Sequence, residues 1–462
     1  MASPTSTTPA PTAASPYQSV HKIRLITATS LFDGHDASIN IFRRIAQATG
    51  AEVIHLGHNR SVQEIVDAAV QEDAQGIAVT SYQGGHNEFF RYMHDMLAER
   101  GCGHVRIFGG GGGVILPQEI DALHAHGISR IYSPDDGRRM GLQGMIDDML
   151  HRCDFATVRQ GEKLPQLDWR DSRSVARAIT MVENHGDELR AELDALAKHP
   201  NQPLVLGITG TGGAGKSSLI DELVRRYLLD FPDRTVAILC VDPSLKKTGG
   251  ALLGDRIRMN AIGDKRCFLR SMATRRANLA LSEAVRDGLT VLKAAGYDLV
   301  ILESSGIGQS DTEITEHADV SLYVMTPEFG AQSQLEKIDM LDYADLVAIN
   351  KFDRKGALDA LRDVRKQYQR NRKLFDRDTA TMPVYGTMAS SFDDPGTNSF
   401  YKALVAKLDE QRPGHFRSTL ALREGDPEQS HIIPVERTRY LAEIVQNARK
   451  YDQWTKEQAQ VA

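Results

Sequence analysis

The segment GITGTGGAGKSSLI, residues 207–220, limits the possible folds of this chain more than any other part of the sequence. Gly210, Gly215, Lys216 and Ser217 have the GxxxxGKS spacing of a phosphate-binding loop, between an apolar run and a helical pattern. In such a loop backbone amides surround phosphate oxygens, the lysine adds positive charge, and the serine hydroxyl binds Mg²⁺. We therefore predict a nucleoside triphosphate site in which Lys216 is also catalytic. Its predicted contacts are Gly212, Gly213, Ala214, Gly215, Lys216, Ser217 and Ser218.

Two series of short apolar runs alternate with helix-length stretches along the chain. The first series occupies residues 21–150, and the second occupies residues 201–415, with strands expected at 235–242 and 298–304. This alternation predicts two α/β domains, each with a parallel sheet covered by helices on both faces. Ligands of such sheets bind at the carboxyl ends of the strands.

The remaining segments are expected to flank or connect these domains. Residues 1–20 are rich in Pro, Ser, Thr and Ala and predict a disordered tail. Residues 151–200 predict a helical linker, with a helix over 172–198, and residues 416–462 predict a C-terminal linker and helix. An apolar face of that last helix needs a covering surface, which is either a partner or the second domain of this chain. The face consists of Tyr440, Leu441, Ile444, Val445, Ala448 and Tyr451.

The sequence NKFD, after the strand expected at 346–349, indicates which base is bound. A carboxylate can accept hydrogen bonds from both N1–H and the 2-amino group of guanine, a donor pair that adenine lacks. Asn350, Lys351 and Asp353 are therefore predicted to select GTP over ATP. Met388 and Ala389, in GTMAS after the next expected strand, are predicted to add backbone contacts to the base.

Two acidic loops lie between these motifs, each after an expected strand. Asp242 and Asp255 occur in VDPSLKKTGGALLGDR, and Glu303 and Gln309 occur in ILESSGIGQSD. Carboxylates beside a phosphate-binding loop hold Mg²⁺ directly or through water. Ser217, Asp242, Asp255 and Glu303 are therefore predicted to bind magnesium, a solvated loop acid being the alternative for each carboxylate. Asp242, Glu303 and Gln309 are also assigned catalytic roles, with Gln309 orienting the attacking water.

Basic residues in the first acidic loop allow two interpretations. They either neutralise charge that develops on the phosphates or are simply solvated, and solvation is the expectation. These residues are Lys246, Lys247, Arg256 and Arg258.

The first domain begins with SLFDGHDAS directly after its first expected strand. A neutral imidazole is a suitable axial ligand for cobalt, and a carboxylate that accepts its other ring N–H fixes the tautomer. His35 is therefore the candidate cobalt ligand of a cobalamin, with Asp33 as its hydrogen-bond acceptor. The alternative is an ordinary surface or core histidine.

Glycine-rich segments follow two further strands of this domain. Without side chains, they permit the close approach of a bulky ligand, and a mobile loop is the alternative. The residues predicted to contact the cofactor are Ser81, Tyr82, Gly84, Gly85, Gly110, Gly111, Gly112 and Gly113.

Several separated motifs resemble a known family. VDPS, GGALLGDRIRM, ESSGIGQSD, TPEFG and NKFD are similar to those of the G-protein chaperones of cobalamin-dependent acyl-CoA mutases. The resemblance covers most of residues 172–412 and implies a P-loop GTPase domain of the metallochaperone, SIMIBI-like type. It also implies that Ser217, Asp242, Asp255 and Glu303 surround magnesium. Ala331 stands where many relatives have an acidic residue after TPEFG, which puts the mechanism of that switch loop in question.

The first domain resembles the base-off, histidine-on cobalamin domains, whose signature is DxHxxG followed by SxL and GG. This resemblance implies a flavodoxin-like, Rossmann-type fold. Ser38 stands in place of the signature glycine, and Thr80, Ser81 and Tyr82 stand in place of SxL.

The order of the two domains resembles the N-terminal part of the fused isobutyryl-CoA mutases. The resemblance implies binding of adenosylcobalamin, GTP or GDP, and Mg²⁺, with GTP hydrolysis gating the loading and protection of the cofactor. The whole reaction that it implies is the radical conversion of isobutyryl-CoA to n-butyryl-CoA. The acyl-CoA-binding barrel of that family is expected to be missing here, so the chain is either truncated or a subunit that uses a partner's barrel.

Two other functions remain open. The chain could be a cobalamin-responsive GTPase that regulates or chaperones a separate mutase subunit. A cobalamin-dependent methyltransferase module is disfavoured, because only a short Pro-rich tail stands where a helical cap is expected.

Composition argues against several classes of partner. A net charge of −6 disfavours nucleic acid and anionic membrane surfaces. No apolar run approaches the ~20 residues of a membrane span. The four cysteines are scattered without metal-binding spacing, which predicts a reducing, cytoplasmic setting. We also expect the chain to form a homo-oligomer.

Overall fold

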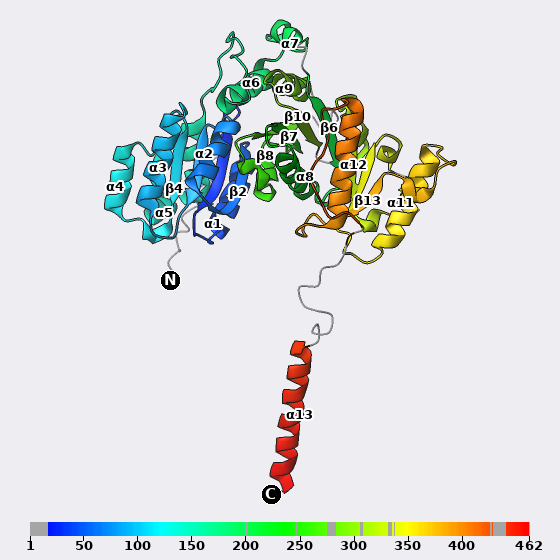
Figure 1. Ribbon diagram of the computed structural model, residues 1–462. Coiled ribbons are helices and arrows are strands. Elements are labelled where there is room, and N and C mark those ends of the chain that lie inside the picture. Colours follow the sequence, from blue (N-terminus) through cyan, green and yellow to red (C-terminus); the bar gives the residue numbers. More distant parts are fainter. Residues whose placement is uncertain are drawn as a thin grey trace, which may run out of the picture.

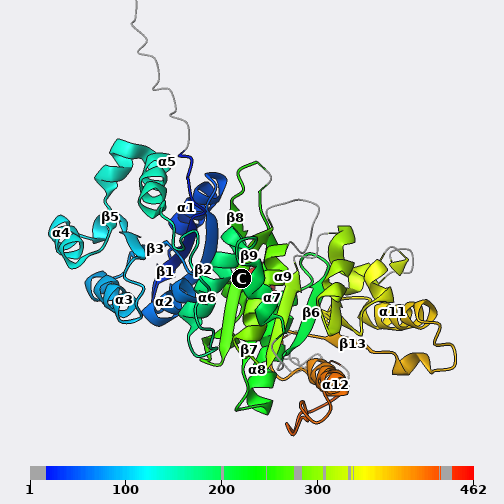
Figure 2. The ribbon, with the colours of Figure 1, turned by 90° about the horizontal axis from the view of Figure 1, so that it is seen from above.

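The computed structural model describes residues 17–198, 202–245, 247–274, 283–304, 308–330, 335–336, 338–425, 427 and 440–461. Two parallel β-sheets with their covering helices form most of the molecule and stand side by side (Figures 1 and 2). A long C-terminal helix projects away from them (Figure 1). The predicted α/β class, with two parallel sheets in succession, is confirmed.

The first sheet has the strand order β5-β4-β3-β1-β2-β8. Its first five strands in the sequence have the order 2-1-3-4-5, which is that of flavodoxin-like folds, as predicted. Strand β1 is buried at every position because helices pack on both faces of the sheet. The elements up to residue 153 are β1 (Arg24–Ser30), α1 (Ala37–Ala48), β2 (Glu52–Arg60), α2 (Val62–Gln71), β3 (Gly76–Thr80), α3 (His86–Glu99), β4 (Arg106–Gly110), α4 (Pro117–His126), β5 (Arg130–Tyr132) and α5 (Pro134–Cys153).

The second sheet has the strand order β13-β12-β11-β6-β10-β7-β9. Its central strand β6 leads directly into the phosphate-binding loop and α8, so this loop lies at the carboxyl edge of the sheet, as predicted. Edge strand β9 was not predicted. The elements are β6 (Leu204–Gly210), α8 (Lys216–Asp230), β7 (Val236–Pro243), β9 (Cys267–Thr274), α9 (Glu283–Ala294), β10 (Leu299–Ser304), β11 (Val320–Met325), β12 (Leu346–Asn350), α11 (Ala357–Asn371), β13 (Val384–Thr387) and α12 (Pro395–Gln411).

Strand β8 (Ala251–Leu253) comes from the second series of elements but belongs to the first sheet. It pairs in parallel with β2, with Ala251 opposite Glu52 and Leu253 opposite Ile54. Ala251 and Leu253 are fully buried in the hydrophobic core of the first domain. Figure 2 shows β8 between β2 and the second sheet. The first sheet is therefore completed by a segment that the sequence assigned to the second domain.

The predicted helix over 172–198 is two helices, α6 (Ser172–His185) and α7 (Arg190–Leu196). Helix α6 ends at Gly186, a residue that weakens a helix. Helix α6 packs against α2 of the first domain and α9 of the second, so this part of the predicted helical linker contacts both domains. Its apolar face belongs to the core of the second domain.

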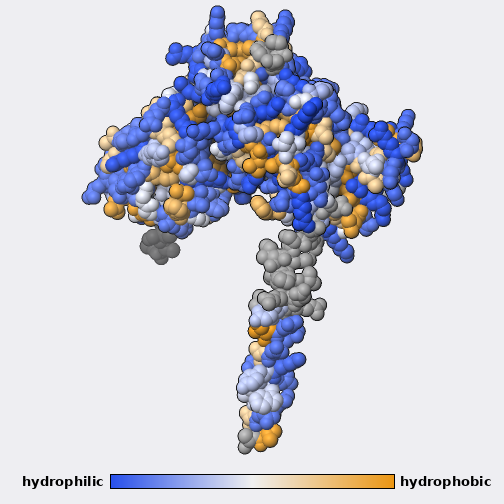
Figure 3. Space-filling view, in the orientation of Figure 1, coloured by the Kyte–Doolittle hydropathy of each residue, from blue (hydrophilic) through white to orange (hydrophobic). Residues whose placement is uncertain are grey.

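The two ends of the chain differ from the prediction in opposite ways. Residues 1–16 of the predicted disordered tail lie outside the described residues, whereas Tyr17 and Val20 are ordered. The Tyr17 hydroxyl and the Val20 amide each donate to Asp154 Oδ2 at 2.7 Å. Helix α13 (Tyr440–Val461) exists as predicted, but it does not pack on the second domain, and all its described side chains are exposed (Figures 1 and 3).

Within the part of the chain that the structure describes, no helix combines the length and apolar character that a bilayer crossing requires.

Candidate nucleotide and cobalamin sites

The loop between β6 and α8 has the geometry of a phosphate site. Helix α8 begins directly after Gly215, so the free amides of its first turn face the loop. Lys216 is buried, and its Nζ donates to the carbonyl oxygen of Gly210 at 3.0 Å, across the loop. Among the described residues, the buried Thr211 hydroxyl has no hydrogen-bond partner. Phosphate oxygens are the acceptors that the free amides and the Thr211 hydroxyl lack, so the loop fits the predicted ligand.

Two carboxylates converge on Ser217, Glu303 from the end of β10 and Asp255 from the 3₁₀ segment η2 (Asp255–Arg258). Its Oγ lies 3.2 Å from Asp255 Oδ1 and 3.0 Å from Glu303 Oε1. Burial and the neighbouring Asp255 raise the pKa of Glu303 to about 8. Burial and Asp255 likewise raise the pKa of Asp242 well above its ordinary value.

This crowding of buried acids is the chemistry of a cation site. Carboxylate and hydroxyl oxygens are the ligands that Mg²⁺ prefers, and a divalent cation would offset the repulsion that raises these pKa values. The structure thus brings together all four predicted magnesium ligands, and they fit the ion. The cluster also contains Cys240, whose Sγ donates to Glu303 Oε2 at 3.5 Å.

The NKFD segment contacts the phosphate-binding loop as well as the predicted base site. Asn350 Nδ2 donates to the carbonyl oxygen of Ala214 at 2.8 Å, and Lys351 Nζ donates to that of Gly213 at 2.7 Å. Asn350 Oδ1 accepts from the amide of Ala389 at 3.1 Å. Asn350 therefore connects the phosphate-binding loop to the loop of Ala389. Asp353, the predicted acceptor for guanine, is exposed.

Other predicted parts of this site are described incompletely. Met388 is buried, and its amide donates to Asp394 Oδ2 at 2.9 Å. Gln309 lies in the 3₁₀ segment η4 (Gly308–Glu316), but its side chain lies outside the described residues. Gly306 and Ala331 also lie outside them.

In the first domain, His35 and Asp33 form the predicted pair. His35 Nδ1 lies 2.7 Å from Asp33 Oδ1, which leaves the other ring nitrogen for a ligand. The His35 side chain is 65% exposed, whereas that of Asp33 is fully buried. Burial alone would raise the pKa of Asp33. Hydrogen bonds from the backbone amides of Tyr82 and His35 and from the His35 ring outweigh it and hold this pKa below its ordinary value. The pair fits a cobalt ligand whose tautomer is fixed by a carboxylate.

An apolar cavity of about 260 Å³ opens beside this pair, at the carboxyl ends of β3 and β4. Tyr82 lines it, and the ring of Tyr82 lies 5.5 Å from that of His35, centroid to centroid. The Tyr82 and Ser38 hydroxyls are hydrogen-bonded at 2.8 Å, so residues from the two departures from the family signature contact each other. Helix α5 contributes Leu142 and Met145, which were not predicted. The cavity fits a flat, largely apolar group of a bulky ligand.

The glycine-rich segments have different roles within this region. Gly110, Gly111 and Gly112 line the cavity, whereas Gly84, Gly85 and Gly113 lie outside its lining. A Cβ atom at Gly111 would lie 2.0 Å from the carbonyl oxygen of Ser81, so this glycine is required by the close approach of two strand ends. The buried Ser81 therefore helps to shape the cavity from behind.

Six charged side chains form a buried cluster between the two domains, here called the interdomain ion cluster. Its members are Arg24, Glu52, Glu72, Glu183, Arg256 and Arg270, each with a side chain at most 5% exposed. Burial would raise the pKa of Glu72, but the guanidinium groups of Arg256, Arg24 and Arg270 hold it below its ordinary value.

Arg256 makes the contact of most interest in this cluster. Its Nε donates to Glu72 Oε1 at 2.8 Å, and it follows the candidate magnesium ligand Asp255 directly. The expectation that Arg256 is solvated is therefore wrong, because the first domain supplies a buried carboxylate for it.

Comparison with known proteins identifies the two domains. Residues 23–132 match the B12 binding domain. Residues 175–406, half of the chain, match the family described as "Methylmalonyl Co-A mutase-associated GTPase MeaB". The chain belongs to the MeaB family of GTPases. With its B12 binding domain, this MeaB-family chain binds cobalamin, binds GTP and GDP with Mg²⁺, and hydrolyses GTP.

Curated relatives combine the same domains. The "Fused isobutyryl-CoA mutase" of Geobacillus kaustophilus is 58% identical over 455 residues, which cover 96% of this chain and 42% of the relative. That of Cupriavidus metallidurans is 57% identical over 448 residues, which cover 96% of this chain and 41% of the relative. The chain thus spans about two fifths of these relatives and corresponds to their cobalamin-binding and GTPase portion. Among solved structures, "LAO/AO transport system kinase" is 27% identical with a TM-score of 0.36, covering 52% of this chain and 75% of that one.

Sequence reasoning missed several residues of this MeaB-family site, and only some had a usable signal. Cys240 precedes Asp242 by two positions on β7, so both side chains share one face of the sheet. Thr211 lies inside the phosphate-binding motif itself. The contact of Arg256 with Glu72 had no local signal, because it joins residues far apart in the sequence.

Proposed function

We propose that this MeaB-family chain couples GTP hydrolysis to the handling of adenosylcobalamin, as the cofactor-binding portion of a radical acyl-CoA mutase. The observation that supports the coupling is the segment from Asp242 to Arg256. The segment contains two candidate magnesium ligands, Asp242 and Asp255. Between them, it contributes strand β8 to the sheet of the cobalamin domain. A change at the magnesium site therefore acts on a strand of the other domain.

The coupling has a short physical route. The contact of Asp255 with Ser217 changes when nucleotide and magnesium bind, and Arg256 follows Asp255 directly. Arg256 donates through Nε to Glu72 and through Nη2 to Gln71 Oε1 at 2.9 Å, at the end of α2. Because Arg256 and its partners Glu72 and Gln71 are buried, a shift of Asp255 is transmitted to α2 and β8 rather than absorbed by solvent.

We assign the nucleotide contacts to the predicted residues. Backbone amides of Gly212–Ser218 and the Lys216 ammonium group bind the phosphates, and Lys216 stabilises charge that develops during hydrolysis. Ser217, Asp242, Asp255 and Glu303 hold Mg²⁺ directly or through water. Asp353 accepts from guanine, with backbone contacts from Met388 and Ala389. Asn350 and Lys351 position the loops, as their hydrogen bonds to Ala214 and Gly213 suggest. Gln309 remains the candidate for orienting water.

For cobalamin, we assign His35 as the axial ligand of cobalt and Asp33 as the residue that fixes its orientation. The apolar cavity lined by Tyr82 and Gly110–Gly112 takes the displaced nucleotide base of the cofactor. The exposed edge of His35 and the open glycine segments, including Gly84, Gly85 and Gly113, leave room for the corrin ring. When bound, the cofactor supplies the radical chemistry of the mutase reaction.

The acyl-CoA substrate requires a further binding domain, either on a longer chain or on a partner subunit. We propose isobutyryl-CoA as the substrate because the two relatives above are named isobutyryl-CoA mutases. The exposed helix α13, with Tyr451 and Trp454 on its surface, is the proposed contact for that domain or for a second copy in a homo-oligomer. The alternative function, a GTPase that regulates a separate mutase, would also couple GTP hydrolysis to cobalamin handling. Mutase turnover when this chain is mixed with an acyl-CoA-binding subunit would support the role as part of a mutase over the role as a regulator.

The four free and buried cysteines support a reducing, cytoplasmic setting for this chain.

An optical titration of the whole chain with adenosylcobalamin tests the cobalamin assignment. We expect an imidazole-ligated, base-off spectrum with wild type that His35→Ala loses. His58→Ala is the matched control, since His58 is an exposed histidine of the same domain, and it should retain the spectrum. An unchanged spectrum with His35→Ala refutes the assignment.

A further inference from the structure

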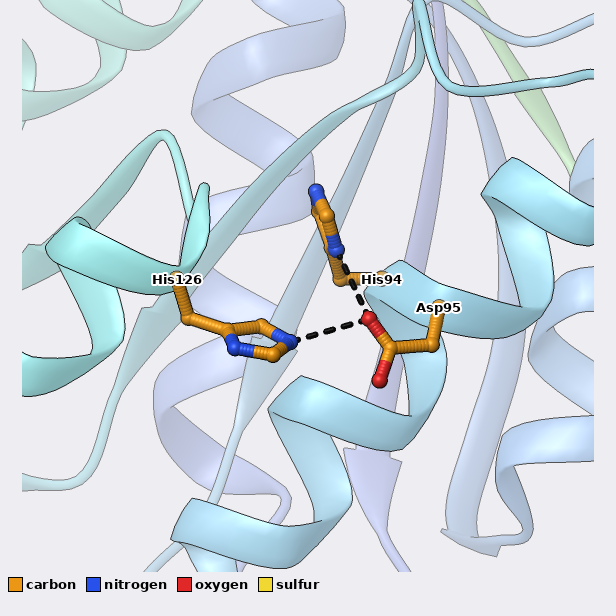
Figure 4. Close-up of side chains that lie close together, drawn as sticks. All are labelled: His94, Asp95 and His126. Carbon is orange, nitrogen blue, oxygen red and sulfur yellow. Dashed lines mark hydrogen bonds and ion pairs between the residues drawn. The ribbon is translucent and has the colours of Figure 1, made fainter.

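A cluster of two histidines and one aspartate lies on the cobalamin domain, outside the sites assigned above. His94 and Asp95 are on α3, and His126 is the last residue of α4. Figure 4 shows the two imidazole rings converging on the carboxylate. Asp95 Oδ1 lies 3.1 Å from His94 Nδ1 and 2.9 Å from His126 Nε2. The two rings are 5.2 Å apart, centroid to centroid.

These three groups form a donor set for a transition metal. Two imidazole nitrogens and one carboxylate oxygen suit Zn²⁺ and its neighbours Co²⁺ and Ni²⁺. Zinc ligands lie about 2.0–2.2 Å from the ion, so atoms around a tetrahedral ion are roughly 3.3 Å from one another. The observed separations of 2.9 Å and 3.1 Å are close to this value. The ligand atoms of all three residues lie within 4.8 Å of one another.

The backbone supports this convergence. Helix α4 ends at Gly127, which follows His126 in the left-handed conformation, with φ +110°. A Cβ atom at Gly127 would lie 2.6 Å from His94 Nε2. The glycine therefore allows the end of α4 to approach the His94 ring, which brings His126 to the same carboxylate.

The cluster is also accessible and charged. The side chains of His94, Asp95 and His126 are 33%, 54% and 34% exposed, so an ion can enter and water can complete its coordination. Hydrogen bonds from His94 and His126 hold the pKa of Asp95 below its ordinary value, which keeps the carboxylate ionised.

We propose that His94, Asp95 and His126 form a binding site for a divalent transition metal of the zinc class. The bound ion joins α3 to the C-terminal end of α4. Helix α4 follows Gly110–Gly112, the glycine segment that lines the cobalamin cavity. By fixing the C-terminal end of α4 on α3, the ion stabilises the helix that follows this segment.

Zinc binding to the whole, cobalamin-free chain tests the proposal. The protein is treated with a chelator and then saturated with GDP and Mg²⁺, so that the acids around Ser217 are occupied. We expect calorimetry to find a zinc site that H94A/H126A lacks, and D95N to bind zinc at least about tenfold more weakly. Zinc should also raise the Tm of wild type but not of H94A/H126A. H151A removes an exposed histidine of α5 and should bind zinc like wild type.

Zinc binding by H94A/H126A with wild-type affinity and stoichiometry overturns the proposal. So does a wild-type Tm that zinc leaves unchanged.

Discussion

The nucleotide site and the cobalamin loop place their key side chains in opposite environments. Glu303 and Ser217 are buried at strand and helix ends, and crowding by other acids raises the pKa of Glu303 to about 8. His35 is exposed on a loop and is hydrogen-bonded to the buried Asp33. A buried site is organised before its ligands arrive, whereas the exposed imidazole depends on one carboxylate for its orientation. The interdomain ion cluster joins the two domains that carry these sites.

The largest expected effect concerns that cluster. In Glu72→Gln, the buried Arg24, Arg256 and Arg270 lose a shared carboxylate, and the free energy of unfolding should fall by about 3–5 kcal/mol. Glu64→Gln is the control on the same helix, because it changes only exposed contacts with Arg60 and Ser61 and should cost at most about 1 kcal/mol. Urea denaturation followed by circular dichroism measures both. Equal losses for the two variants contradict the importance assigned to the cluster.

The next effect separates the two sites. Lys216→Ala removes the phosphate-loop ammonium group, and the rate of GTP hydrolysis should fall about 10²–10³-fold. Cobalamin binding by the nucleotide-free protein should be unchanged, since Lys216 donates to Gly210 of its own loop and does not line the cobalamin cavity. Single-turnover hydrolysis and an optical cobalamin titration measure these two properties. Lys407→Ala, on α12, should hydrolyse GTP like wild type.

A smaller effect tests base recognition. Asp353→Asn replaces a carboxylate acceptor by an amide and should weaken GTP binding by about 10–100-fold, the range for hydrogen bonds to a charged group. Binding of a fluorescent GTP analogue measures the loss. Asp376→Asn, an exposed acid of the same domain, should bind GTP like wild type, and equal affinities of the two variants would remove Asp353 from the base site.

The smallest effect sharpens the role of the exposed loop. Asp33→Asn keeps the side-chain volume but weakens the acceptor for His35, so cobalamin affinity should fall about tenfold. Asp36→Asn changes an exposed acid of the same loop that makes no side-chain cap to α1, and its affinity should not change. Optical titration compares them. A stronger loss in Asp36→Asn would show that net charge, rather than the pair, determines affinity.

Much of the fold could be predicted from local patterns. Most strands of both sheets are apolar runs between turn residues. The phosphate-binding loop is recognised from the spacing of Gly210, Gly215 and Lys216. The convergence of Ser217 and Glu303 followed from the rule that strand ends of a parallel sheet share one edge. Asp255, which follows β8 of the first sheet, joins them although that rule does not place it there. The pairing of Asp33 with His35 could be predicted because the two residues are only two positions apart in the sequence.

What could not be predicted depends on contacts between distant segments. Ala251–Leu253 is too short to be recognised as a strand, and its pairing with β2 brings together residues some two hundred positions apart. Glu72 and Arg256 are ordinary surface residues by composition and become buried only because the domains meet. The contribution of α5 to the cobalamin cavity likewise requires the packed fold.

The affinity of the whole chain for adenosylcobalamin in two nucleotide states tests the coupling most directly. Optical titrations are made with Mg²⁺ and either GDP or a non-hydrolysable GTP analogue. The account predicts dissociation constants that differ by about fivefold or more between the two states, and a reciprocal effect of cobalamin on nucleotide affinity of the same size. Identical cobalamin affinities in both states would contradict it.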